Sequence, residues 1–125
     1  MKKIALALLI TLAPVGAVQA QNMPVSQFLA KAEALKKKGP LALFSGDMKV
    51  LKGEINESAK AYGTDVRAAR KAGKLTHSCP PQGTTLSMNS DELLGYFNSI
   101  PPAQRGMTVK AAFYNLMKKK FPCPA

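Results

Sequence analysis

The sequence predicts an all-α protein, a small four-helix bundle-like domain with one disulfide, preceded by a signal peptide. Apolar residues recur at helical spacing in four segments, and no segment alternates as a strand would with comparable strength. The two cysteines both lie beyond the apolar N-terminus. We expect the signal peptide at 1–20 and a single helical domain at 21–125, which is long enough to bury a modest core.

The N-terminal segment has the three-part order of a secretory signal peptide. Lys2 and Lys3 precede an apolar run at 4–12, and small residues close the segment at Val18 and Ala20. The run is shorter than the roughly 20 apolar residues that span a bilayer, so an uncleaved membrane anchor is the weaker alternative. We therefore expect cleavage after Ala20, a periplasmic location and no stable membrane insertion.

The charge is strongly basic. The chain has 18 Lys and Arg residues against 7 Asp and Glu residues, and loss of Lys2 and Lys3 with the signal peptide lowers the formal charge from +11 to +9. Basic domains often bind nucleic acid, but export and the absence of Trp argue against that partner. Acidic proteins or anionic membrane surfaces fit better, through electrostatic steering. The alternative is that the lysines only keep the protein soluble.

Two cysteines in an exported chain favour a disulfide between Cys79 and Cys123. The bridge would close a sequence separation of 44 residues, which the chain-entropy model equates with about 4 kcal/mol of stability. Prolines flank both cysteines, which suits a structural bridge. No Cys-x-x-Cys pair is present, so a redox-active site is not expected.

The first two helices are expected at 25–38 and at about 46–72. Gly39 should end the first helix and Ser45 should cap the second. The short apolar linker 41–44 is expected to pack against the core. Gly63 and Thr64 could kink the second helix, and Gly73 should end it.

The buried and polar faces of these two helices follow from the spacing of their residues. Glu54 is assigned to the polar faces with the basic residues. The predicted buried positions are Phe28, Leu29, Ala32, Leu35, Met48, Leu51, Ile55, Tyr62, Val66 and Ala69. The long helix could instead lie on a membrane, but its polar face mixes both signs of charge, which favours packing.

A loop at 74–88 separates these helices from two more. The third helix is expected to begin near Ser90, with Asn89 as its cap, and to end before Pro101. The fourth is expected at about 108–120, capped by Thr108. Their predicted buried positions are Leu93, Leu94, Phe97, Ile100, Val109, Ala112, Phe113, Leu116 and Met117.

No catalytic, cofactor-binding or metal site is predicted, and the protein is not expected to be an enzyme or to need a cofactor. His77 is the only histidine, and a metal site that joined it to the cysteines would lack zinc spacing. Asp91 and Glu92 are adjacent carboxylates, but they fall in the first turn of a predicted helix, where negative charge is favourable anyway.

The C-terminal half resembles a known family over residues 78–123. The matching runs are Ser78-Cys79-Pro80-Pro81, Asp91-Glu92-Leu93-Leu94, Tyr96-Phe97, Pro101-Pro102, Val109-Lys110-Ala111-Ala112-Phe113 and Phe121-Pro122-Cys123. Together they resemble the Tai-type immunity family, the resistance-associated immunity proteins of type VI secretion. Cys79, Pro81, Phe121, Pro122 and Cys123 match the family motif, in which the two cysteines are bridged.

The resemblance implies a periplasmic immunity protein that binds and inhibits a peptidoglycan amidase effector, with a homodimer as a further expectation. The partner surface is expected in the loop that holds His77, Ser78 and Gln82, or on the basic helix faces. The alternative is a small periplasmic binding or chaperone-like protein without enzymatic activity. The low acidic content argues against a chaperone that is switched on by acid.

Overall fold

The computed structural model describes residues 22–83 and 87–124. Within them the chain forms four α-helices and two short 3-10 helices, and no strand. The all-α prediction is confirmed, whereas the predicted signal peptide lies outside the described residues. The elements are α1 (Val25–Lys38), η2 (Gly39–Phe44), α2 (Gly46–Lys71), α3 (Ser90–Ser99), η3 (Pro102–Gln104) and α4 (Val109–Lys120).

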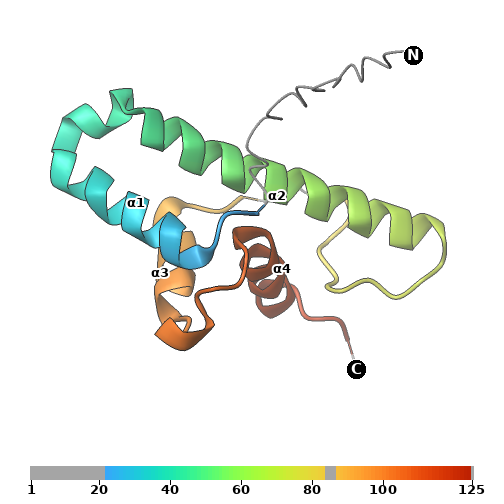
Figure 1. The fold of residues 1–125 in the computed structure, drawn as a ribbon. Helices are drawn as coiled ribbons and strands as arrows, with labels where there is room; N and C mark the ends of the chain where they lie inside the picture. Colours follow the sequence, from blue (N-terminus) through green and yellow to red (C-terminus); the bar gives the residue numbers. More distant parts are fainter. Residues whose placement is uncertain (1–21, 84–86, 125) are drawn as a thin grey trace, which may run out of the picture.

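The long helix α2 organises the molecule (Figure 1). The chain reverses at η2, so that α1 lies beside the N-terminal part of α2. Helix α4 packs across the α1–α2 pair and makes its most extensive contacts with α2. Helix α3 packs against α1. Beyond α4 the C-terminal end of α2 projects outward, and the loop that follows returns toward α4 (Figure 1).

The predicted N-caps are confirmed. The Ser45 hydroxyl accepts a hydrogen bond from the backbone N–H of Asp47 at 3.2 Å. Asn89 Oδ1 accepts from Glu92 N–H at 2.7 Å, and Thr108 Oγ1 accepts from Ala111 N–H at 3.1 Å. Each cap satisfies a backbone donor that has no partner inside its own helix. Local sequence signals therefore place the starts of α2, α3 and α4.

A second set of contacts joins the start of α1 to the start of α4. The backbone N–H of Val25 donates to the carbonyl of Met107 at 2.9 Å, and the N–H of Val109 donates to the carbonyl of Met23 at 2.8 Å. These bonds satisfy terminal donors of both helices. They bring the beginning of the described chain against the C-terminal half.

The core forms where the α1–α2 pair meets α3 and α4. Phe28 meets Phe97 edge-on, with ring centroids 5.3 Å apart, and Tyr62 meets Phe113 at 6.0 Å. Such edge-to-face pairs add to the stabilisation from apolar burial. The buried apolar residues are Val25, Phe28, Leu35, Ala42, Leu51, Tyr62, Val66, Leu93, Phe97, Ile100, Val109, Ala112, Phe113, Leu116 and Met117. Most of the predicted buried positions are thus confirmed.

The expectation for the linker 41–44 is wrong. Only Ala42 is buried, whereas Leu41, Leu43 and Phe44 are 73%, 71% and 88% exposed. The segment forms the 3-10 helix η2 at the outer end of the α1–α2 pair, beyond the reach of α3 and α4 (Figure 1). No neighbouring element covers it there, so its apolar side chains face solvent.

The expectation for Glu54 is also wrong, because this residue is completely buried. Leu51, Glu54, Ser58 and Tyr62 follow one another at steps of three and four and share the buried stripe of α2. No hydrogen bond of ordinary geometry reaches either carboxylate oxygen within the described residues. Burial raises the pKa of Glu54, although the nearby backbone N–H groups of Met23 and Asn22 act in the opposite direction. The same helix runs unbroken through Gly63 and Thr64, so the predicted kink is absent.

Candidate functional site

The first candidate site is the end of the molecule that the disulfide closes. Cys79 and Cys123 are bridged, with Cα atoms 4.8 Å apart, as predicted. The backbone N–H of Cys79 also donates to the carbonyl of Phe121 at 2.8 Å. The loop after α2 is thus held against the tail after α4 by one covalent bond and one hydrogen bond.

Polar contacts anchor the same loop to α2. The hydroxyl groups of Tyr62 and Ser78 share a buried hydrogen bond of 2.5 Å. The Arg70 guanidinium donates to the carbonyl of Pro80, and the Thr76 hydroxyl donates to the carbonyl of Ser78. Because a buried polar group is destabilising unless it is paired, these contacts favour one conformation of the loop.

The three residues expected to meet a partner fall into two groups. His77 and Gln82 are exposed, whereas Ser78 is buried and its hydroxyl is used inside the protein. The His77 ring lies 5.9 Å from the ring of Tyr114. Burial and a hydrogen bond to Asp65, 2.6 Å long, raise the pKa of Tyr114, which therefore stays protonated and donates. Of the three residues, His77 and Gln82 therefore remain available to a partner, beside other exposed residues of the loop such as Leu75, which is 97% exposed.

The residues on which the family resemblance rests lie at this end. The disulfide links Cys79 to Cys123, and the Cys79 hydrogen bond brings in Phe121. Phe121 is half-buried against the core, and its neighbour Pro122 is exposed, as is Pro81 beside Cys79. Residues that are 40 or more positions apart in the chain thus form one local structure.

The second candidate site is an apolar groove between the α1–α2 pair and the α3–α4 pair. It encloses about 660 Å³, within the range of about 300–1,000 Å³ that is common for small-molecule pockets. Apolar side chains from all four α-helices line it, and none of its lining residues is acidic. The residues that define the groove for the argument below are Ala32, Lys36, Met48, Lys52, Met88 and Met117.

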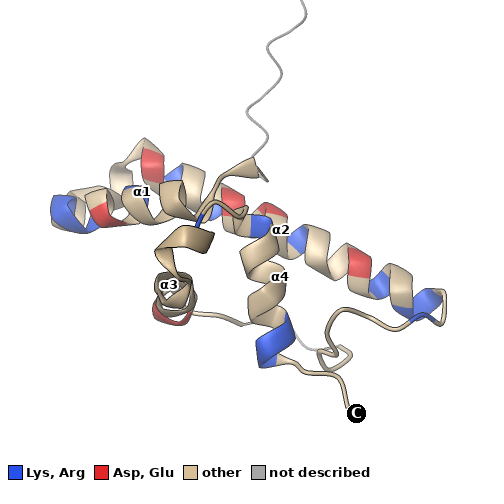
Figure 2. Ribbon diagram, turned by 60° about the horizontal axis from the view of Figure 1, so that its bottom comes forward, with Lys and Arg blue, Asp and Glu red and all other residues tan. Residues whose placement is uncertain are grey.

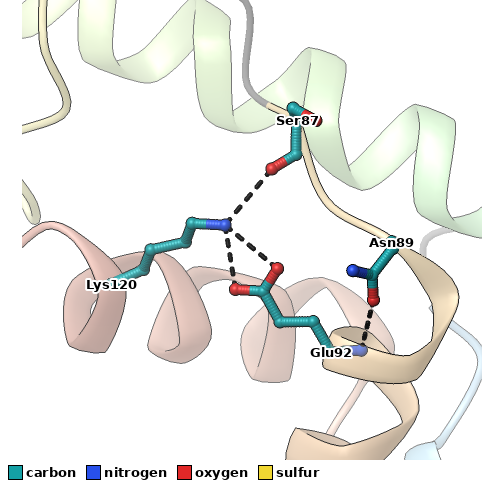
Figure 3. A network of polar contacts seen from close by, with 4 residues as sticks. All are labelled: Ser87, Asn89, Glu92 and Lys120. Carbon is teal, nitrogen blue, oxygen red and sulfur yellow. Dashed lines mark hydrogen bonds and ion pairs between the residues drawn. The ribbon is translucent and has the colours of Figure 1, made fainter.

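Three lysines border the groove, and one of them is neutralised. Lys120 Nζ donates to the Glu92 carboxylate at 2.8 and 3.1 Å and to the backbone carbonyl of Ser87 at 3.2 Å (Figure 3). Asn89, which caps α3, lies beside this network (Figure 3). Lys36 and Lys52 are exposed and form no ion pair among the described residues. The groove therefore has unpaired positive charge at its η2 end.

Exposed apolar side chains continue the groove outward at η2. Leu43 both lines the groove and is 71% exposed. The three lysines in the last turn of α1, Lys36 to Lys38, lie immediately before η2, and Figure 2 shows basic residues at this end of the molecule. Sequence reasoning missed this combination, because it assigned the apolar linker to the core.

The described residues contain no group of three or more His, Cys, Asp or Glu side chains that could hold a metal ion. Within residues 22–83 and 87–124, no helix combines the length and apolar character needed to cross a bilayer. Comparison with family models, with curated proteins and with solved structures gives no significant match to this chain.

Proposed function

We propose that this chain is an exported inhibitor of the immunity type, a distant relative of the Tai-type family, which binds a peptidoglycan amidase effector in the periplasm. The observation that supports this proposal is the anchored loop at the disulfide end. It presents His77 and Gln82 to solvent while the disulfide, Ser78 and Pro80 hold its backbone. A loop that is ordered before binding loses little conformational entropy on binding, which favours tight inhibition.

The charge of the surface suits a protein partner with an acidic face. Basic residues occupy the last turns of α1, α2 and α4 (Figure 2). Arg70 and Lys71 precede the loop, and Lys118 to Lys120 precede Cys123. Charges around a docking surface mainly accelerate encounter and orient the partner. The proposed order of events is steering by the lysines, followed by contact of the loop with the enzyme.

The proposal is tested by co-purification of the oxidised protein with the exported cell-wall amidases that the same genome encodes. We expect one of them to bind, and we expect His77→Ala combined with Gln82→Ala to weaken binding at least tenfold. Gln27→Ala is the matched control, because Gln27 is an exposed residue of the same type on α1. If no amidase binds and deletion of the gene leaves cells resistant, the proposal is wrong. The mass of the periplasmic form tests cleavage after Ala20.

A second candidate function is a periplasmic binding or chaperone-like module. The exposed Leu41, Leu43 and Phe44 beside the groove favour it, because large apolar patches on a surface commonly mark binding sites. Suppression of the aggregation of an unfolded client would support this function. A variant with Leu41, Leu43 and Phe44 all changed to Ser should then lose the protection, while the Gln27→Ala control keeps it.

A further inference from the structure

We propose that the groove binds a single-chain anionic amphiphile, with its hydrocarbon chain among the apolar side chains and its head group at Lys36 and Lys52. The inference is independent of the inhibitor proposal. The head-group end lies beside η2, which precedes α2, whereas the loop of the inhibitor proposal follows α2.

The interior of the groove fits a flexible hydrocarbon chain. Met48 of α2, Met88 of the loop before α3 and Met117 of α4 line it. Methionine side chains are unbranched and polarisable, and they adapt to irregular apolar ligands. Ala32 leaves space on the α1 side because its side chain is small. A buried chain would also cover apolar surface that is otherwise in contact with water, which favours binding.

The charge distribution selects an anion as the head group. Lys36 and Lys52 border the η2 end, no lining residue is acidic, and the third lysine is already paired with Glu92. A neutral hydrocarbon would leave the two lysines without a function in the site. A second copy of the chain would bring its own lysines of the α1 end toward them, and like charges disfavour that contact. A single acyl chain that carries a carboxylate or a phosphate fits both parts of the groove, because the chain matches the apolar interior and the anion matches Lys36 and Lys52.

The test uses the oxidised protein and a fluorescent dansyl-labelled undecanoic acid, kept below its micellar concentration. We expect one probe to bind per chain with a blue-shifted emission. Palmitate or palmitoyl lysophosphatidylglycerol should displace it, and uncharged monopalmitoylglycerol should displace it at least tenfold more weakly. Displacement by palmitate alone identifies a free fatty acid as the ligand, and displacement by the lysophospholipid alone identifies a lipid phosphate.

Two variants test the geometry. The double variant Lys36→Glu with Lys52→Glu should weaken probe binding about tenfold. The control is Lys71→Glu with Lys74→Glu, which makes the same change of charge at the far end of α2. The control should leave probe binding unchanged. Ala32→Phe should fill the groove and abolish binding, with circular dichroism as the check of folding.

Failure of the unaltered protein to bind the probe would overturn the proposal. Displacement of the probe by monopalmitoylglycerol as strong as that by the charged lipids would also overturn it. The same would follow if the Lys71/Lys74 variant lost as much probe affinity as the Lys36/Lys52 variant. If light scattering shows a dimer that excludes the probe, or if only an acidic amphipathic peptide binds, the groove is a protein interface and the proposal is wrong.

Discussion

The hydroxyl groups of Tyr62 and Ser78 share a hydrogen bond in the core beneath the disulfide, 16 residues apart in the chain. Tyr62 belongs to α2 and is 1% exposed, and Ser78 belongs to the loop and is fully buried. This bond connects the longest helix to the loop that carries His77. The position of the proposed binding surface therefore depends on a contact inside the protein.

Tyr62→Phe removes the tyrosine hydroxyl from this bond, so the buried Ser78 hydroxyl loses its partner. We expect the variant to lose about 1–3 kcal/mol of unfolding free energy, measured by urea denaturation. Tyr96→Phe is the matched control, since Tyr96 is only partly buried, and should change stability little. The double variant Tyr62→Phe with Ser78→Ala should lose less than the sum of the two single changes. Additive losses would show that the two hydroxyl groups are not coupled.

The disulfide should supply a large part of the stability. Replacement of both Cys79 and Cys123 by Ser should lower the free energy of unfolding by about 4 kcal/mol, because the unfolded chain regains the freedom of the closed loop. Addition of a reducing agent to the unaltered protein should give a similar loss. The same agent should have no effect on the double-serine variant. A reduced protein that is as stable as the oxidised one would contradict a structural role for the bridge.

Glu54 should make the stability depend on pH. Burial raises its pKa in the folded protein above the ordinary value of 4.5, so the folded state holds the proton more tightly than the unfolded state. The resulting stabilisation is complete below pH 4.5 and is lost as the pH rises through the folded pKa. Glu54→Gln cannot ionise, so its stability relative to the unaltered protein should increase from pH 4 to pH 7.

Paired urea denaturations at the two pH values measure this difference. Glu57→Gln is the control, because Glu57 is on the surface and pairs with Lys60. The effect of Glu57→Gln on the free energy of unfolding should differ much less between the two pH values. A Glu54→Gln effect that stays constant, or that becomes less favourable at pH 7, would contradict the raised pKa.

The Lys120 network should matter more for local order than for global stability. The pair with Glu92 is partly exposed, at 27% and 37% for the two side chains, so Lys120→Met should lower stability by no more than about 1 kcal/mol. The same change releases the carbonyl of Ser87 (Figure 3). Hydrogen exchange should therefore become faster in residues 87–89. Lys118→Met, an exposed change on the same turn, should leave the exchange rate as it was.

The sequence was sufficient to predict the elements, because their ends depend on local chemistry. Ser45, Asn89 and Thr108 are caps whose partners lie two or three residues away. The cysteine pair was predictable because only one pairing exists. The apolar spacing of α4 likewise identified its buried face.

The errors concern residues whose surroundings depend on distant elements. The charge of Glu54 predicts a position on the polar faces, but the backbone of Asn22 and Met23, more than 30 residues away in the chain, lies beside it in the buried part of α2. The apolar character of Phe44 predicts a position in the core, but no element lies over η2 and the side chain is exposed. The groove was not predictable, since its walls come from four helices whose relative placement no local pattern encodes.

The most direct test of the central claim is a titration of amidase activity. Each exported amidase of the same genome is assayed on purified peptidoglycan with rising amounts of the oxidised protein. We expect one enzyme to lose its activity near one equivalent, and we expect the variant with both His77→Ala and Gln82→Ala to need at least ten times more protein for the same loss. Full activity of every such amidase in the presence of excess protein would contradict the proposal that this chain is their inhibitor.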